Sequence, residues 1–165
     1  ISYIEANGSG SEVTDLLELK AIQSVYRSSH TEACGLGSIK PNIGHPLCAE
    51  GIASLIKVVL MLKQRQLVPF LSGQEPMTHF HMESTPFYFQ RQLSEWNDSP
   101  RIAAINCFAD GGTNANVVLQ SWEEAVSRPN KRHSIAPPTL NRFDVYREEK
   151  PNHTISIWKR QIVEG

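Results

Sequence analysis

The 165-residue sequence has few of the features that mark secreted, metal-binding or membrane proteins. Its three cysteines, Cys34, Cys48 and Cys107, lack CxxC spacing and are odd in number. They argue against a disulfide framework or a zinc site and for a reducing compartment. Lys and Arg total 16 against 17 Asp and Glu, which gives no electrostatic case for binding nucleic acid or an anionic membrane. The apolar run at residues 55–62 is too short to span a bilayer and contains Lys57.

The start of the sequence lacks an initiator methionine and a signal-peptide pattern. We therefore expect a cytoplasmic protein, and we expect this chain to be a segment of a longer polypeptide. Hydrophobic residues make up 40% of the chain, which is enough for a packed core. After about Glu124, prolines and basic residues replace the apolar runs. We therefore predict a folded domain at residues 1–124 and a linker at residues 125–165.

The hydrophobic pattern predicts strands that alternate with helices, which is typical of α/β proteins. The helix predicted at residues 14–27 has apolar residues such as Val25 at helical spacing, with Glu18 facing outward. A second, almost wholly apolar helix is predicted from Pro46 to about Gln66, buried between layers. The predicted strands are residues 1–6, 34–39, 87–90, 101–109 and 115–120.

His45 lies in an Asn-Ile-Gly-His-Pro segment directly before this apolar helix. Gly44 allows a tight turn, and Pro46 suits the first helical position, where no backbone N–H is needed. The positive end of the helix dipole would favour a neutral imidazole, which can donate a hydrogen bond to a carbonyl oxygen. A purely structural histidine in a turn is the alternative for this residue taken alone.

Three further segments carry candidate polar groups. Asn7 begins a Gly- and Ser-rich loop after the first strand, where α/β proteins place functional groups. Lys40, just before the His45 turn, either orders that loop as a buried, paired lysine or faces solvent. The Gly-Gly-Thr-Asn turn at residues 111–114 lies between two apolar strands, and its glycines would let a ligand approach closely. The alternative for the Asn7 loop and for the turn at residues 111–114, each taken alone, is a plain connection with no further role. The alternative for Asp110 is a solvated turn residue.

The order of these segments is more specific than any one of them. Residues 3–11 (Tyr-Ile-Glu-Ala-Asn-Gly-Ser-Gly-Ser), 37–45 (Gly-Ser-Ile-Lys-Pro-Asn-Ile-Gly-His) and 111–119 (Gly-Gly-Thr-Asn-Ala-Asn-Val-Val-Leu) closely resemble the C-terminal part of a β-ketoacyl synthase. The nearest resemblance is to ketosynthase domains of modular polyketide synthases that are served by a free-standing acyltransferase. It covers about residues 1–124, and the tail resembles the linker that follows such domains.

The resemblance implies a thiolase-like α/β fold, layered α/β/α/β/α, of which this chain would be the C-terminal half only. It also implies a homodimer, an N-terminal half that supplies a nucleophilic cysteine, and acyl carrier proteins as partners. Phosphopantetheine would be carried by the partner acyl carrier protein, with no cofactor or metal bound by this chain. Neither nucleic acid nor a membrane span is expected.

Carried over residue by residue, the resemblance assigns the family's second histidine to His45 and its supporting lysine to Lys40. Asn7 stands where the family has its first histidine, and Leu47 stands where it usually has a glutamate. Glu50 is nearby but is not the same position. No cysteine of this chain matches the nucleophile, so all three are expected to be buried thiols. The expected substrate-binding residues of the acyl gate are Phe108, Asp110, Gly111, Gly112, Thr113 and Asn114, with Asp110 in place of a phenylalanine.

The asparagine at position 7 decides the predicted function. An elongating ketosynthase loads an acyl group onto its cysteine and then condenses it with a decarboxylated malonyl thioester, whose developing charge two histidines stabilise. An asparagine amide donates a hydrogen bond but cannot exchange a proton near neutral pH. We therefore predict a non-elongating acyltransferase that passes acyl chains between carrier proteins. The alternatives are an elongating ketosynthase with Asn7 as an adequate donor, and a catalytically silent docking scaffold.

Overall fold

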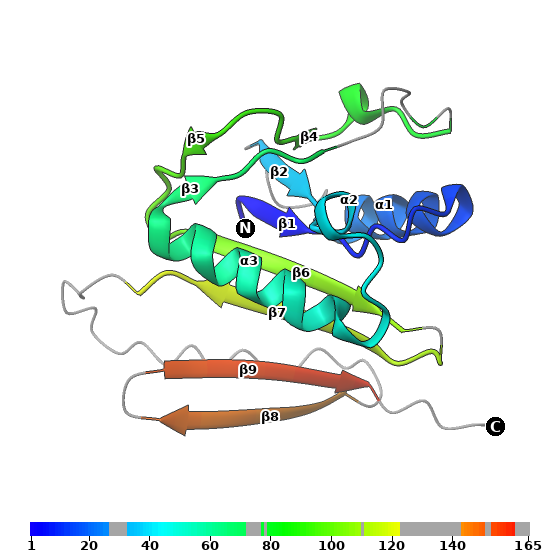
Figure 1. Cartoon of the computed structure of the whole chain (residues 1–165). Helices are drawn as coiled ribbons and strands as arrows, with labels where there is room; N and C mark the ends of the chain where they lie inside the picture. Colours follow the sequence, from blue (N-terminus) through cyan, green and yellow to red (C-terminus); the bar gives the residue numbers. More distant parts are fainter. Residues whose placement is uncertain are drawn as a thin grey trace. The chain divides into compact units, whose positions relative to one another are not determined.

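A computed structural model describes residues 1–26, 33–71, 77, 79–109 and 111–122, together with the backbone of residues 143–150 and 153–160. The chain divides into two compact units, Ile1–Ser121 and Trp122–Gly165 (Figure 1). In the second unit, β8 (Phe143–Lys150) and β9 (His153–Arg160) form an antiparallel pair. The sequence pattern does not predict these two strands. The rest of the linker predicted at residues 125–165 lies outside the described residues.

The first unit is built on a five-stranded sheet in the order β4-β2-β1-β6-β7. Neighbouring strands pair in parallel except β6 and β7, which form an antiparallel hairpin. Because the carboxyl ends of parallel strands meet at one edge of a sheet, the segments after β1, β2 and β6 come together there. All five strands coincide with predicted ones: β1 (Tyr3–Glu5), β2 (Cys34–Gly37), β4 (Phe87–Phe89), β6 (Ile102–Phe108) and β7 (Asn114–Gln120).

Each face of this sheet carries its own apolar core. Tyr3 and Ile4 of the central strand β1 are both fully buried, as expected for a parallel strand that is covered on both faces. On one face Tyr3 packs in a cluster with Val58 of helix α3 (Glu50–Gln64), which Figure 1 shows lying along β6. On the other face Ile4 packs in a cluster with Ile22 of helix α1 (Glu12–Tyr26). The predicted α/β class is confirmed by this layering.

Helix α1 begins at Glu12, two residues before the predicted start, and differs from its predicted pattern at two positions. Glu18 was expected to face outward but is 4% exposed, because its carboxylate accepts N–H groups from the loop after β1. Val25, which the helical spacing assigns to the core, is exposed. The prediction for Glu18 is wrong because a pattern treats every carboxylate as solvated, whereas a buried one is stable when it is hydrogen-bonded.

The single helix predicted from Pro46 begins later than expected, at Glu50, after two shorter elements. A four-residue helix, α2 (Lys40–Ile43), ends at Gly44, and a 3-10 turn, η1 (Leu47–Ala49), precedes α3. Leu47 has a φ of 47°, a left-handed conformation through which a right-handed helix cannot continue. The prediction that Pro46 opens the long helix is therefore wrong. The argument from the dipole of that helix also fails, because α3 begins five residues after His45.

One face of α3 is apolar and exposed. Val58 is buried, whereas Ile52, Ile56, Val59 and Leu60 are each about half exposed. The prediction of a helix buried on all sides is therefore wrong for this chain, because the described elements cover only one side of α3. No helix in the described part of the chain is both long and apolar enough to cross a membrane.

Three short elements complete the first unit. Strand β3 (Gln66–Leu67) follows α3 and pairs antiparallel with β5 (Ser94–Glu95). A 3-10 turn, η2 (Met82–Ser84), precedes β4. Trp96, directly after β5, is 1% exposed and meets the ring of Tyr3 edge to face at 6.0 Å between centroids. These elements close the end of the sheet that lies away from the loops described next.

Candidate active site

The loop after β1 is held by two carboxylates of helix α1. The backbone N–H groups of Asn7 and Gly8 donate to Glu18 Oε1 and Oε2 at 2.7 and 2.9 Å. The backbone N–H and hydroxyl of Ser9 both donate to Asp15 Oδ1, at 2.7 and 2.9 Å. These acidic side chains therefore satisfy the donors of a Gly- and Ser-rich loop that has no partner strand.

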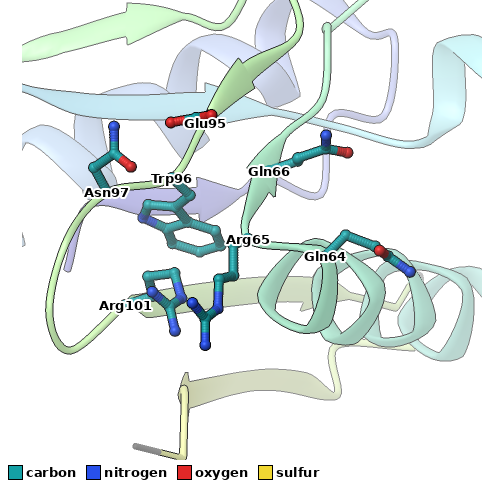
Figure 2. Close-up of a pocket in the computed structure, with 7 residues that line it drawn as sticks. All are labelled: Gln64, Arg65, Gln66, Glu95, Trp96, Asn97 and Arg101. Carbon is teal, nitrogen blue, oxygen red and sulfur yellow. The ribbon is translucent and has the colours of Figure 1, made fainter.

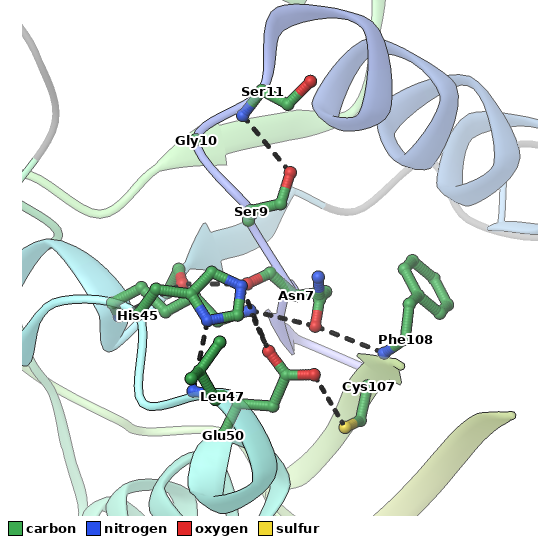
Figure 3. A network of polar contacts seen from close by, with 12 residues as sticks. Asn7, Ser9, Gly10, Ser11, His45, Leu47, Glu50, Cys107 and Phe108 are labelled. Carbon is green, nitrogen blue, oxygen red and sulfur yellow. Dashed lines mark hydrogen bonds and ion pairs between the residues drawn. The ribbon is translucent and has the colours of Figure 1, made fainter. Parts of the chain in front are cut away.

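The side chain of Asn7 is oriented by two donors. Its Oδ1 accepts from Lys40 Nζ at 3.0 Å and from the backbone N–H of Phe108 at 3.2 Å, and the residue is 5% exposed. An amide NH₂ accepts neither bond, so both donors require oxygen at this position. Figure 3 shows that Nδ2 points away from both donors. Asn7 therefore presents its two N–H groups, and not its oxygen, to whatever binds beside it.

Lys40 is the first residue of α2 and is buried, as one of the two sequence readings proposed. The residue is 7% exposed, and its Nζ lies 2.6 Å from Glu50 Oε2 in an ion pair. The direction of this contact does not suit a hydrogen bond, so Oε2 keeps hydrogen-bonding capacity. The ammonium of Lys40 thus links Asn7 to the start of α3.

His45 follows Gly44 and keeps 40% of its side chain exposed. Its Nδ1 accepts the backbone N–H of Leu47 at 3.2 Å (Figure 3). A neutral imidazole that accepts at Nδ1 carries its proton on Nε2, so this contact selects the tautomer that donates from Nε2. This N–H belongs to the turn directly after His45, two residues along the chain. The tautomer is therefore set by local backbone geometry and not by the dipole of α3.

Glu50 is a member of this group that the sequence analysis left out of the site. The residue is 7% exposed, and its Oε2 lies 3.6 Å from His45 Nε2. Its Oε1 accepts from the thiol of Cys107 at 3.7 Å. Because residues three apart share one side of a helical turn, Glu50 lies one turn beyond Leu47, where the family usually has its glutamate. A search of the sequence for a carboxylate one helical turn beyond Leu47 would have found Glu50.

The three cysteines differ in their surroundings. Cys34 is buried, and burial raises its pKa to about 12. Burial also raises the pKa of Cys107, with further contributions from the neighbouring Glu50 carboxylate. Cys107 is partly buried and Cys48 is exposed, so the prediction that all three are buried thiols is confirmed only for Cys34 and is wrong for Cys48. The low-pKa surroundings typical of a nucleophilic thiol are absent at both Cys34 and Cys107.

The hairpin between β6 and β7 contributes Phe108 to the site. Its backbone N–H binds Asn7, and its side chain is half-buried. The predicted turn at residues 111–114 is present: Ala109 donates to the carbonyl of Thr113 at 3.1 Å, and Gly112 has a φ of 80°. Residues 111–114 are exposed, and in the described part of the chain their side chains form no hydrogen bond with the Asn7 group. Asp110 lies outside the described residues.

A separate polar cavity of about 470 Å³ lies at the opposite end of β6 (Figure 2). Arg101 precedes the first residue of β6, whereas Phe108 is its last, so the strand separates the two places. None of the residues predicted for the site lines this cavity. Its lining residues are Gln64, Arg65, Gln66, Glu95, Trp96, Asn97 and Arg101.

Comparison with known proteins identifies relatives over most of the chain. Residues 1–74 match the family described as the C-terminal domain of β-ketoacyl synthases. The polyketide synthase PksL of Bacillus subtilis (strain 168) is 65% identical over 145 residues, which are 88% of this chain and 3% of PksL. The oxazolomycin ketosynthase domain OzmH KS8 of Streptomyces albus JA3453 is 58% identical with a TM-score of 0.68, covering 72% of this chain and 32% of that one.

A second solved structure agrees with this assignment. The ketosynthase from module 6 of the bacillaene synthase of Bacillus subtilis 168 is 37% identical with a TM-score of 0.70, covering 74% of this chain and 23% of that one. The expected thiolase-like fold and the restriction to its C-terminal part are confirmed by these likenesses. The chain spans about a third or less of the ketosynthase structures it matches and a few per cent of PksL.

Proposed function

This chain is the C-terminal part of a ketosynthase domain of a modular polyketide synthase, and from that premise we propose that the complete domain is a non-elongating acyltransferase. It would accept an acyl chain from one acyl carrier protein and pass it to the next without adding carbons. A subtype served by a free-standing acyltransferase, as the sequence resemblance implies, belongs to the same proposal.

The transfer itself is a thioester exchange. A cysteine thiolate of the N-terminal half attacks the acyl thioester of the carrier's phosphopantetheine, and the pantetheine thiol leaves and takes up a proton. The reverse exchange then delivers the acyl group to the next carrier. His45, with its proton on Nε2, and the NH₂ group of Asn7 are the donors in this chain that could face the thioester oxygen. Phosphopantetheine thus arrives as part of the substrate.

The orientation of Asn7 is the observation that carries the proposal. Its oxygen is occupied by Lys40 and Phe108, so its amide faces the site only as a neutral hydrogen-bond donor. Condensation needs more than transfer does, because negative charge develops on the malonyl thioester oxygen when carbon dioxide leaves. Weakening one donor to such an oxyanion typically costs about 10²–10³ in rate. Acyl transfer should survive this loss better than condensation.

The partners proposed for this chain follow from what it leaves uncovered. The half-exposed Ile52, Ile56 and Leu60 of α3 form an apolar face of the kind that packs against another folded layer. We assign this face to the N-terminal half of the ketosynthase domain. Assembly as a homodimer, a cytoplasmic location and a linker role for residues 125–165 complete the proposal. The gate residues Phe108, Asp110 and Gly111–Asn114 would bound the acyl chain.

Intact-mass analysis of the complete domain tests the proposal directly. The domain is loaded from an acyl carrier protein and is then given a malonyl carrier protein. We expect an acyl adduct that moves to a second carrier with its mass unchanged. A chain-extended product formed at an ordinary ketosynthase rate would show that Asn7 suffices for condensation. The absence of any acyl adduct would identify a silent docking domain.

A further inference from the structure

The polar cavity at the far end of β6 has no part in the proposed transfer, and two arginines line it. Arg101, which directly precedes β6, is 8% exposed, whereas Arg65, which directly follows α3, is exposed. Figure 2 shows both guanidinium groups on the same side of the Trp96 indole, with the Glu95 carboxylate on the other side. Two cations from separate elements therefore line one cavity of about 470 Å³.

The backbone of Arg101 is fixed where the hairpin of β6 and β7 begins. Its N–H donates to Ser121 Oγ at 3.1 Å, and its carbonyl accepts the Ser121 N–H at 2.8 Å. Its Nη1 donates to the carbonyl of Asp98 at 3.4 Å, while the Asp98 carboxylate accepts the Trp96 indole N–H at 2.8 Å. A guanidinium carries five N–H donors in a rigid fork, so it can bind protein and ligand at the same time.

Arg65 is held in a conformation that favours glycine. Its φ of 57° is left-handed, its N–H donates to the carbonyl of Met61, and its carbonyl accepts the Trp96 N–H at 2.8 Å. Within the described residues, its guanidinium forms no ion pair. The dipole of α3 favours a cation at this end, but Lys63 already supplies one in the last turn. A strained backbone that carries an arginine points to a use of its side chain.

We propose that this cavity binds a phosphate monoester, with the phosphate group held by the guanidinium groups of Arg65 and Arg101. A phosphate dianion matches two fixed cations in charge and offers several acceptor oxygens to their N–H groups. Further donors come from the side-chain amides that line the cavity, those of Gln64, Gln66 and Asn97. The site lies at the opposite end of β6 from Asn7, so this inference does not depend on the proposed function.

The first measurement compares three probes on the complete ketosynthase domain by isothermal titration at pH 8 and constant ionic strength. Methyl phosphate is a dianion at this pH, whereas dimethyl phosphate and acetate each carry one charge. We expect saturable binding of methyl phosphate that is about tenfold tighter than binding of either monoanion. Equal binding of all three would reveal general charge attraction and overturn the inference. No saturable binding would overturn it as well, because the cavity would then be filled or closed in the complete domain.

The second measurement repeats the methyl phosphate titration with Arg65→Gly, which removes the guanidinium and suits the left-handed backbone. Binding should weaken about tenfold or more while the midpoint of denaturant unfolding stays the same or rises.

Lys63→Gln is the matched control, because it removes an exposed cation of the same helix that does not line the cavity. It should keep binding within about twofold. Arg101→Lys keeps the charge but loses the fork, so it should also weaken binding. Binding that survives Arg65→Gly, or that falls equally in Lys63→Gln, would place the anion elsewhere and overturn the inference. Acyl transfer and condensation are read separately, so neither result changes the proposed function.

Discussion

At the scale of single residues, the two hydrogen bonds that the Asn7 side chain accepts are the most informative part of the structure. Two donors from distant parts of the chain, Lys40 and the backbone of Phe108, converge on one oxygen. Both are donors only, so the amide has one allowed orientation. A histidine at this position could gain and lose a proton near neutral pH, whereas the asparagine amide can only form hydrogen bonds. The chemical consequence of the substitution therefore depends on its neighbours as well as on its identity.

Replacing Asn7 with histidine tests this reasoning. In the complete domain, Asn7→His should raise the rate of condensation by about 10²-fold, because a donor that can carry charge returns to the oxyanion. Product formation from acyl and malonyl carriers measures this rate. Little change on Asn7→His would mean that the native asparagine is already competent.

The buried thiol of Cys34 makes a pH-dependent contribution to stability. Burial raises its pKa from the ordinary 9.0 to about 12, so the thiol stays protonated in the folded state after it would ionise in the unfolded chain. The resulting stabilisation is complete below pH 9 and is lost as the pH rises from about 9 to 12. Denaturant titrations of wild type and Cys34→Ala should show their difference in unfolding free energy shrinking by roughly 2 kcal/mol between pH 9 and 11.

Cys48→Ala provides the control for that prediction. Cys48 is exposed, so its removal should change the unfolding free energy by the same small amount at every pH in this range. A constant difference between wild type and Cys34→Ala would show that the thiol at position 34 ionises as freely in the folded domain as in the unfolded chain.

At the scale of elements, strands β1 and β2 approach helix α3 through a buried polar group. Tyr3 donates to Glu5 Oε2 at 2.7 Å, and Lys57 of α3 lies 2.6 Å from the same oxygen. Both strand residues are fully buried, so the ion pair connects the sheet to the helix away from solvent. Gly37, at the end of β2, leaves the space that the tyrosine hydroxyl occupies. Because the loops that carry Asn7 and Lys40 follow β1 and β2 directly, this contact fixes where they begin.

Gly37→Ala should therefore destabilise the complete domain. The added Cβ would overlap the hydroxyl of Tyr3, which its bonds to Glu5 and Lys57 prevent from moving away. Overpacking of this kind costs about 2 kcal/mol, measured as a lower midpoint of denaturant unfolding. Tyr3→Phe should rescue part of the loss by removing the overlapping atom.

A matched alanine substitution checks that the effect is local. Gly111 has no atom within 4 Å of an added Cβ, so Gly111→Ala should leave the unfolding midpoint nearly unchanged. If Gly37→Ala were equally harmless, the close approach of β2 to Tyr3 would not constrain the fold.

At the scale of the whole molecule, the chain has a complete sheet and an incomplete set of layers. Both faces of β1 are covered, yet the outward side of α3 keeps four large apolar residues about half exposed: Ile52, Ile56, Val59 and Leu60. An apolar stripe of this kind on one helix is unfavourable in water unless another layer covers it. The polar loops carrying Asn7 and His45 lie at the edge of this same incomplete unit.

The isolated 165-residue chain should therefore aggregate, whereas the same chain produced together with the N-terminal half of the domain should be monodisperse. Size-exclusion chromatography and binding of an apolar dye report the two states. Polar substitutions at Ile52 and Ile56 should reduce aggregation of the isolated chain, because they shrink the exposed stripe. A monomeric, cooperative thermal transition of the isolated chain would contradict this view.

The pattern of residues along the sequence was sufficient to predict several features of this protein. The short apolar runs predicted all five strands of the main sheet. For the central strands this succeeds because residues that are covered on both faces of a sheet are mostly apolar. The order of three short motifs was sufficient to indicate the family. The identities of Asn7, Lys40 and His45, and the replacement of a histidine by an amide, are visible in the sequence itself.

Only the tertiary structure decided how these residues act. The burial of Glu18 and the position of Glu50 beside Lys40 and His45 depend on contacts between separate elements, which periodicity does not encode. Asn7 receives its two hydrogen bonds from residues 33 and 101 positions away, so its orientation exists only once β1, α2 and β6 have assembled. The physical reason is that a polar side chain takes its state from the donors, acceptors and charges around it, and folding alone brings those together.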